Sequence, residues 1–339
     1  MALNKDIIQK QLYEGYGIKN AVIDSVGAEG FQAKVIFLHT EDGKYVSKWF
    51  IPSKPNNELY VSSRMDFVRF LSDNNISVPH VVPTLKGDYY YKLDGSDFLY
   101  LTIYPFLEGK VLFDVVEEEG VFSDFVEALA YLHSVSRKYA ISSSEVFAPP
   151  MDISQTIHDM NKLFLKRLEE NTLGLSQDQK EALSLLWGKS LTSMLELEKD
   201  ATTFEQNLPI NGDLSLADVL VGDSIRFLDF DMVKLGDPIE DIAKLVVHWI
   251  VSKSMNANDI IVLIDRILEV YTTKLYQLDS SVSQSITSDF LRKMVLFLYW
   301  RTLYVFLVEP DDMELRKKFL NLLVDYSPHA PQLVSSLVN

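Results

Sequence analysis

The chain has 339 residues, of which 47% are hydrophobic and 24% charged, and its formal net charge is −16. This composition is that of a soluble globular protein, and the length favours two domains or lobes that each bury a core. The acidic balance excludes the basic surface of a nucleic-acid binder, and the absence of cysteine excludes disulfides, cysteine nucleophiles and thiolate metal sites.

The first residues carry Lys5, Asp6 and Lys10 within their apolar pattern, which is not the pattern of a signal peptide. The apolar run at 242–251 is too short and too interrupted to span a bilayer. We therefore expect a cytoplasmic protein with neither nucleic acid nor membrane as a partner.

The first hundred residues are mostly β in pattern, with one inserted helix. An amphipathic helix is expected at the N-terminus, followed by two strands, a turn, a return strand, a second helix and a second hairpin whose turn is Asp94-Gly95. In chain order these elements are expected at 4–15, 21–27, 32–40, 41–43, 44–51, 58–75 and 88–106.

Beyond residue 109 the pattern becomes helical. Helices are expected at 123–136, where Ser123 is the N-cap, at 153–171, at 176–199 and from Pro238 onward. Two short β-like pieces interrupt them at 218–222 and 225–230. This order predicts an α+β protein with a β-rich N-terminal lobe, 1–108, and a helical C-terminal lobe, 109–339.

The segment 209–245 is apolar but contains seven aspartates. Asp213 lies in a loop between apolar anchors, whereas Asp218 and Asp229 stand on the two strands of an expected hairpin, which would bring their carboxylates together. Converging carboxylates need a cation, and Mg²⁺ suits a site built from oxygen ligands. It would come with a phosphate-bearing ligand, since protein-bound Mg²⁺ is usually shared with substrate phosphates.

This segment, "NGDLSLADVLV…FLDFDMVKLGDPIEDIA", resembles the signature of the aminoglycoside phosphotransferase and choline kinase superfamily, whose members share the two-lobed protein-kinase-like fold. Other pieces resemble the family's phosphate-covering loop and lysine strand, the segment after its N-lobe helix, its hinge and the helix that follows. They read "GAEGFQAKVIFLHTEDGKYVSKWF", "ISVPHVVPT", "LTIYPFLEGK" and "ALAYLH". Each piece is weak alone, but their common order from about residue 20 to 245 makes the resemblance specific.

The resemblance implies an ATP-dependent phosphotransferase that acts on a hydroxyl of a small molecule, such as an aminoglycoside, an amino sugar or a choline-like compound. Catalysis of this reaction is mostly positioning and charge neutralisation. By this resemblance Asp213 accepts the hydroxyl proton, Asp218 and Asp229 bind Mg²⁺, and Lys48 holds the phosphates. The expected C-lobe supplies the catalytic loop and the substrate pocket.

The resemblance also implies the contacts to the nucleotide. Gly27 and Gly30 would let the backbone close over ATP. At the hinge, the carbonyl of Pro105 and the N–H of Leu107 would meet the adenine edge; proline lacks an N–H, but its carbonyl is the group required there.

Several residues also have an interpretation that involves no chemistry. Lys48, taken alone, fits an exposed strand lysine. Asp237 is expected to cap a helix, Asp241 to bind loop N–H groups, and His133 to lie in the core or support the hinge. Asp223 fits a solvated turn, and for Asp231 both an exposed position and one facing the phosphates stay open.

Three positions depart from the family pattern. Asn211 replaces the histidine before Gly-Asp, and Asp218 replaces a metal-binding asparagine. Near the place of the helix glutamate that pairs with the strand lysine stands Arg64, between Ser63 and Met65.

In another register of that helix, Glu58 or Asp66 would become the partner of Lys48. Because of these three departures, the alternative function is that of a catalytically impaired kinase-like protein that binds nucleotide or a partner protein. Joint retention of Lys48, Asp213 and Asp229 favours the active kinase. Its acidic residues weakly suit a cationic, amine-bearing acceptor, although we favour solubility as the explanation of the net charge.

Overall fold

The computed structural model describes most of the first 279 residues. The described ranges are 5–29, 33–52, 57–93, 97–142, 147–148, 153–170, 208–253 and 257–279, with single residues between 177 and 195. The chain divides into two compact units, each assembled from separated segments. Unit 1 comprises Met1–Phe122, Val135–Ala148 and Ala217–Lys234, and unit 2 comprises Ser123–Ser134, Pro149–Leu216 and Leu235–Asn339.

Unit 1 is built on a five-stranded sheet with strand order β1-β2-β3-β5-β4, in which every neighbouring pair is antiparallel. The strands are β1 (Val22–Glu29), β2 (Ala33–Thr40), β3 (Gly43–Phe50), β4 (Tyr91–Lys92) and β5 (Tyr100–Pro105). The expected strands of the first fifty residues are thus confirmed to within two residues, and the turn between β2 and β3 follows the pairing of Thr40 with Gly43.

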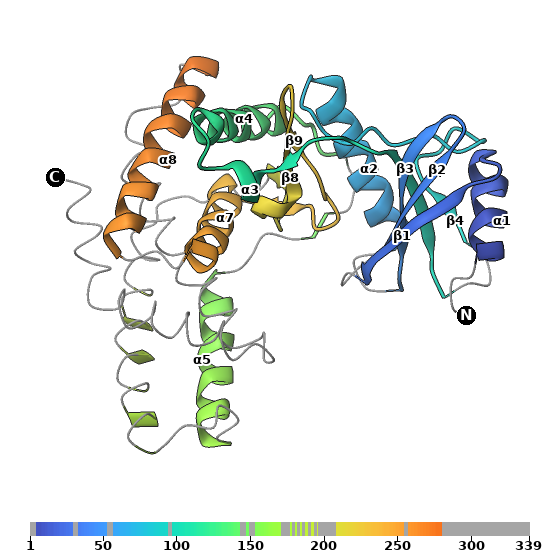
Figure 1. Cartoon of the computed structure of the whole chain (residues 1–339). Coiled ribbons are helices and arrows are strands. Elements are labelled where there is room, and N and C mark those ends of the chain that lie inside the picture. The colour runs from blue at the N-terminus through green and yellow to red at the C-terminus, as the bar shows by residue number, and fades with distance from the viewer. Residues whose placement is uncertain are drawn as a thin grey trace. The chain divides into compact units, whose positions relative to one another are not determined.

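Two helices, α1 (Lys5–Tyr16) and α2 (Glu58–Asp73), lie on opposite sides of this sheet (Figure 1). Side chains alternate between the faces of a strand, so Trp49 of β3 packs in the cluster that contains Leu12 of α1. Its neighbour Phe50 packs against Val61 of α2 on the other face. By the same alternation Lys48 shares the face of Phe50, which directs its ammonium toward the α2 side.

The second expected hairpin is shorter than the sequence pattern suggested. β4 has two residues and pairs with the start of β5, Tyr91 with Leu101 and Lys92 with Tyr100. The predicted turn residues Asp94-Gly95 lie outside the described residues.

The remainder of unit 1 contains a small antiparallel sheet with strand order β6-β8-β9. Its strands are β6 (Lys110–Val111), which leads into the short helix α3 (Leu112–Val115), β8 (Val219–Val221) and β9 (Ile225–Phe227). The hairpin expected from the two short β-like pieces is therefore present. The two aspartates do not stand on its strands as expected: Asp218 ends the 3-10 helix η2 (Leu216–Asp218) just before β8, and Asp229 lies two residues after β9. The two ends still meet, because the N–H of Leu228 donates to the carbonyl of Asp218 at 2.7 Å.

Unit 2 is mainly helical, so the predicted α+β class is confirmed. Its described elements include most of α4 (Val121–Ser136), α5 (Ile153–Glu169), α7 (Pro238–Lys253), α8 (Ala257–Leu278) and the strands β7 (Leu208–Ile210) and β10 (Lys234–Gly236). Of the helix expected at 176–199, only single residues are described. Among described helices, none is long and apolar enough to cross a membrane.

The start of α4 differs from the prediction. The helix begins at Val121, so Ser123 lies in its first turn instead of at its N-cap. Gly120 precedes the helix with φ of 82°, a left-handed conformation that glycine adopts without strain. This glycine turns the chain just before the helix, which therefore begins two residues earlier than predicted from the serine.

Candidate active site

A cavity of about 510 Å³ lies entirely within unit 1. Most of its lining is apolar, with side chains from β2, β3, α2 and the β8–β9 hairpin. The lining includes Pro105, the last residue of β5, and the two residues after it, Phe106 and Leu107. It also includes four charged residues: Lys48, Asp218, Asp229 and Asp231. An apolar cavity with a few polar groups is the usual form of a small-molecule site.

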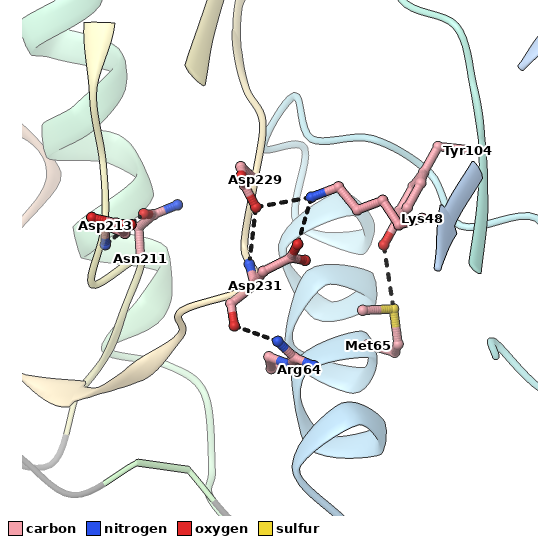
Figure 2. A network of polar contacts seen from close by, with 8 residues as sticks. All are labelled: Lys48, Arg64, Met65, Tyr104, Asn211, Asp213, Asp229 and Asp231. Atoms are coloured by element: carbon pink, nitrogen blue, oxygen red, sulfur yellow. Dashed lines mark hydrogen bonds and ion pairs between the residues drawn. The ribbon is translucent and has the colours of Figure 1, made fainter. Parts of the chain in front are cut away.

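The ammonium of Lys48 lies between two carboxylates, as Figure 2 shows. Its Nζ donates to Oδ1 of Asp229 and to Oδ2 of Asp231, each at 2.8 Å. Burial alone would lower the pKa of Lys48, but Asp231 and Asp229 together outweigh it and raise this pKa above its ordinary value. Lys48 is therefore charged, and the interpretation as an exposed strand lysine is wrong.

The two aspartates differ in exposure, so only one of their carboxylates is accessible to a ligand. The side chain of Asp229 is 49% exposed and that of Asp231 only 12%. Burial tends to raise the pKa of Asp229, but Lys48 outweighs it and the pKa is lowered; for Asp231 burial prevails and the pKa is raised. Asp229 is thus the ionised carboxylate that remains open to a ligand, whereas Asp231 is a buried partner of Lys48.

The backbone at Asp229 is unusual. Its φ is 51°, a left-handed conformation that few non-glycine residues adopt and that aspartate and asparagine adopt more readily than most. The turn is closed by a hydrogen bond from the N–H of Asp231 to Oδ1 of Asp229 at 3.3 Å. This turn places both carboxylates on the same ammonium.

Helix α2 fixes the segment that follows this turn. Arg64 is fully buried, donates through a guanidinium nitrogen to the carbonyl of Asp231, and lies over the rings of Phe50 and Tyr60 at 5.1 and 4.6 Å. The hydroxyl of Tyr60 donates to the carbonyl of Val233 at 2.6 Å. A basic residue of α2 thus supports the loop that carries both acidic partners of Lys48.

The acidic partners of Lys48 therefore come from the chain after β9. Glu58 and Asp66, the alternative partners expected on α2, form their ion pairs elsewhere: Glu58 with Lys92 at 3.1 Å and Asp66 with Arg69 at 3.6 Å. That alternative is wrong for this reason. Met65, next to Arg64, lines the cavity, and the hydroxyl of Tyr104 donates to its sulfur at 3.6 Å.

The loop that carries Asp213 lies in unit 2 and follows the buried strand β7. Asp241 of α7, fully buried, accepts the N–H of Asn211 at 2.9 Å and that of Gly212 at 2.8 Å. Oδ1 of Asn211 accepts the N–H of Asp213 at 3.0 Å. Gly212 has φ of 78°, so a glycine is favoured at this bend. The loop is therefore held rigidly while the side chain of Asp213 stays 52% exposed.

The predicted structural roles of the neighbouring residues are confirmed. Asp237 caps α7, since its Oδ1 accepts the N–H of Ile239 at 3.0 Å, and Asp241 binds loop N–H groups. His133 is fully buried, with one ring nitrogen 2.7 Å from the hydroxyl of Tyr271 and the other 3.4 Å from Asp241. It supports the loop through Asp241.

One ion pair of this loop was not predicted from the sequence. Lys244 of α7 contacts the carboxylate of Asp213 and donates to the carbonyl of Gly212 at 3.1 Å. The signal that could have found it is helical spacing, because Lys244 follows Asp241 by three residues and so lies on the same face of α7.

The sequence of the chain matches the model of the phosphotransferase enzyme family over residues 26–262, which is more than half of its length. The chain belongs to this family. It is a phosphotransferase, as its resemblance to aminoglycoside phosphotransferases and choline kinases implied.

Solved structures confirm the protein-kinase-like fold of this phosphotransferase. A spectinomycin phosphotransferase in complex with ADP and spectinomycin is similar with a TM-score of 0.67 and 15% identity, over 98% of this chain and 100% of that one. An amicoumacin kinase in complex with AMP-PNP and Ca²⁺ has a TM-score of 0.68 and 15% identity, over 98% of this chain and 94% of that one. A choline kinase from Cryptosporidium parvum Iowa II has a TM-score of 0.64 and 13% identity, over 99% of this chain and 100% of that one. No curated protein matches the chain in sequence.

The predicted site residues of the phosphotransferase fall into three groups. Lys48, Pro105, Leu107, Asp218 and Asp229 line the cavity of unit 1, whereas Asp213 lies on the loop of unit 2.

Two glycines form the third group. Gly27 lies within β1, at a register shift between Val26 and Glu29, and it is absent from the described cavity lining, whereas Gly30 lies outside the described residues. Because β1 extends through Glu29, Gly27 sits on a strand, where a phosphate-covering loop was expected.

Proposed function

We propose that this phosphotransferase transfers the γ-phosphoryl group of ATP to a hydroxyl of a small molecule and uses Mg²⁺. The observation that carries the proposal is the ammonium of Lys48, held at 2.8 Å from Asp229 and from Asp231 in a cavity bordered by the hinge. A fixed cation beside an open carboxylate suits a nucleotide phosphate and its metal.

The hinge offers the backbone groups that an adenine edge requires. The N–H of Phe106 donates to Lys44 of β3 at 2.9 Å, so the backbone of Phe106 faces the neighbouring strand. Backbone groups alternate in direction along an extended chain, and those of Pro105 and Leu107 therefore point away from β3. The carbonyl of Pro105 accepts and the N–H of Leu107 donates in this arrangement.

Asp218 and Asp229 fit a magnesium site. Both line the same cavity and both offer carboxylate oxygens, and Mg²⁺ is usually held by one or two carboxylates together with substrate phosphates. Within the described residues no cluster of three acidic, histidine or cysteine ligands occurs. The proposed site therefore requires the phosphates as further ligands. Bound there, Mg²⁺ supplies neutralisation of the charge that develops on the phosphate oxygens.

In this proposal Asp213 accepts the proton of the acceptor hydroxyl, and its loop is kept in place by Asp241 for that task. The region 1–108 serves as the N-lobe that covers the nucleotide, and 109–339 as the C-lobe with the catalytic loop and the substrate pocket. Gly27 and Gly30 allow the backbone near the phosphates to approach closely.

The acceptor in this proposal is an aminoglycoside, an amino sugar or a choline-like compound. Named ligands or substrates of similar structures include spectinomycin, choline and ethanolamine. A net charge of −16 favours the approach of such cationic compounds. The expected location of the protein, the cytoplasm, supplies ATP and Mg²⁺.

The experiment begins with thermal unfolding in the presence of ATP, with and without Mg²⁺. Specific binding at a hundred times the dissociation constant stabilises the folded state by about 2.7 kcal/mol. A metal-dependent rise in melting temperature supports the proposal. Absence of any shift with ATP and either Mg²⁺ or Mn²⁺ contradicts it.

Consumption of ATP is then measured against panels of amines, amino sugars and antibiotics, and the best acceptor is tested with Asp213→Asn. We expect this variant to bind ATP normally and to turn over about 10²- to 10⁴-fold more slowly, since a positioned proton acceptor contributes this much. Retained turnover with a lowered melting temperature would make Asp213 a structural residue.

A further inference from the structure

Lys244 lies against the carboxylate that the proposed reaction uses as its proton acceptor. Its side chain is only 12% exposed, whereas that of Asp213 is 52% exposed. The ammonium is therefore held at the protein side of the carboxylate, and the solvent side of Asp213 remains open to an acceptor.

The contacts of Lys244 complement those of Asp241. Both residues lie on the same face of α7, three positions apart, and both reach the loop 211–213. Asp241 accepts the N–H groups of Asn211 and Gly212, whereas Lys244 donates to the carbonyl of Gly212 and pairs with Asp213. The same face of α7 thus provides a carboxylate that accepts the N–H groups of the loop and an ammonium that binds its oxygen atoms.

The charges around Asp213 decide its protonation. Lys244 favours the ionised carboxylate, because an opposite charge in contact stabilises the charged form. Other titratable groups beside this loop include Asp241 and, behind it, His133 with Tyr271. Asp241 is engaged by two N–H groups and by His133, whereas the ammonium of Lys244 contacts the Asp213 carboxylate directly.

We propose that Lys244 is a positioning residue of the transfer reaction: it stabilises the ionised form of Asp213 and fixes the direction of its carboxylate. This inference rests on the proposed function. In the reaction the acceptor oxygen forms a bond to the γ-phosphorus while its proton passes to Asp213. The bond from the γ-phosphorus to the bridging oxygen breaks, and its electron pair leaves on ADP.

Two substitutions separate the charge of Lys244 from its hydrogen bond. Lys244→Gln keeps a side-chain N–H donor, one bond shorter than lysine, but removes the charge. Lys244→Arg keeps the charge. Hydrolysis of Mg·ATP, with water as the acceptor, is measured from pH 3 to 8 for both variants and the wild type, together with the melting temperature and the affinity for a fluorescent ADP analogue.

For Lys244→Gln we expect the acid side of the rate–pH profile to move upward by about one pH unit or more, with the rate recovering at high pH. For Lys244→Arg the acid side should stay near that of the wild type. Nucleotide affinity, which the proposal assigns to the cavity of unit 1, should change less than twofold in both variants. An unmoved acid side in a folded Lys244→Gln protein overturns the inference.

A double-mutant cycle tests whether Lys244 acts through Asp213. In an Asp213→Asn background, Lys244→Gln should cause no further loss of rate, because interacting residues are not additive. A full additional loss would show a role independent of Asp213 and overturn the inference. If the wild type binds no Mg·ATP, the proposed function itself is overturned. If the wild type is active and the rate–pH profile of Lys244→Gln equals that of the wild type, only the role of Lys244 is overturned.

Discussion

Asp229 and Asp231 share one ammonium but differ fourfold in side-chain exposure, 49% against 12%. In the proposed site the exposed carboxylate would exchange Lys48 for a metal ion, whereas the buried one would keep Lys48 in place. The proposed division of labour between two residues of the same short loop rests on this difference.

Replacement of Asp229 by asparagine should remove the metal dependence of nucleotide binding while the protein stays folded. The amide has the size of the carboxylate but lacks the charge that attracts Mg²⁺. The measurement is a titration of ATP with and without Mg²⁺, and Asp223→Asn, on an exposed turn of the same hairpin region, is the matched control. Equal enhancement of affinity by Mg²⁺ in the variant and the wild type would refute the metal assignment.

Lys48→Ala should weaken ATP binding about 10- to 100-fold, because a hydrogen bond to a charged group contributes roughly 1.5 to 3 kcal/mol. The fold should persist, since burial already raises the pKa of Asp231 and this carboxyl can take up a proton once the cation is gone.

The control for Lys48→Ala is Lys44→Ala on the same strand, whose side chain is 63% exposed. Calorimetric titration with Mg·ATP compares the two variants. If both variants bind ATP as the wild type does, Lys48 is not the phosphate contact.

At the scale of elements, two side-chain hydrogen bonds connect α2 to the segment 231–233. Tyr60 and Arg64, one helical turn apart on α2, both donate to carbonyls of this segment, which follows the turn at Asp229. The position of the helix and the position of the proposed metal ligand are therefore linked.

Tyr60→Phe removes one of these two contacts and nothing else. The hydroxyl is buried, so its loss should lower the free energy of unfolding by about 1 to 2 kcal/mol. We also expect weaker Mg·ATP binding, because the segment 231–233 loses a support. Urea unfolding and nucleotide titration measure both effects, and Tyr90→Phe, whose hydroxyl bond to Glu58 is exposed, is the control. A change in stability without a change in Mg·ATP affinity would disprove the link.

The sequence predicted those elements whose pattern is local. Alternating side chains defined β2 and β3, and the aspartates on the two strand-like pieces identified the hairpin that places Asp218 and Asp229 in one cavity. Contacts between distant residues could not be predicted in this way. Arg64 meets Asp231 across 167 positions, and no periodicity within α2 indicates that its basic residue supports an acidic loop.

At the scale of the whole molecule, unit 1 is not a contiguous stretch of chain. Phe67 of α2 packs with Tyr139, Phe147 and Phe230 at ring-centroid distances of 5.2, 6.3 and 6.3 Å, and these partners come from the second and third segments of the unit. The folded unit therefore depends on residues up to 234.

A fragment of residues 1–122 should consequently fail to unfold cooperatively. It retains the five-stranded sheet but exposes the apolar side of α2 and leaves buried cations without their partners, which is costly. Urea unfolding followed by circular dichroism is the measurement, with the full chain as reference. A single sharp transition in the fragment would show that the first segment folds by itself.

The same contacts set an order of events during protein synthesis. Lys48 and Asp229 are separated by 181 positions, and Tyr60 and Val233 by 173. At about 5 to 20 residues per second, the ribosome needs roughly 10 to 35 s to deliver these partners. The face of the sheet that packs on α1 draws its buried residues from positions 8 to 103 and can close early. The face that carries Lys48 must wait in water until residues 229–233 have emerged, so the proposed phosphate-binding end of the cavity forms later than the face on α1.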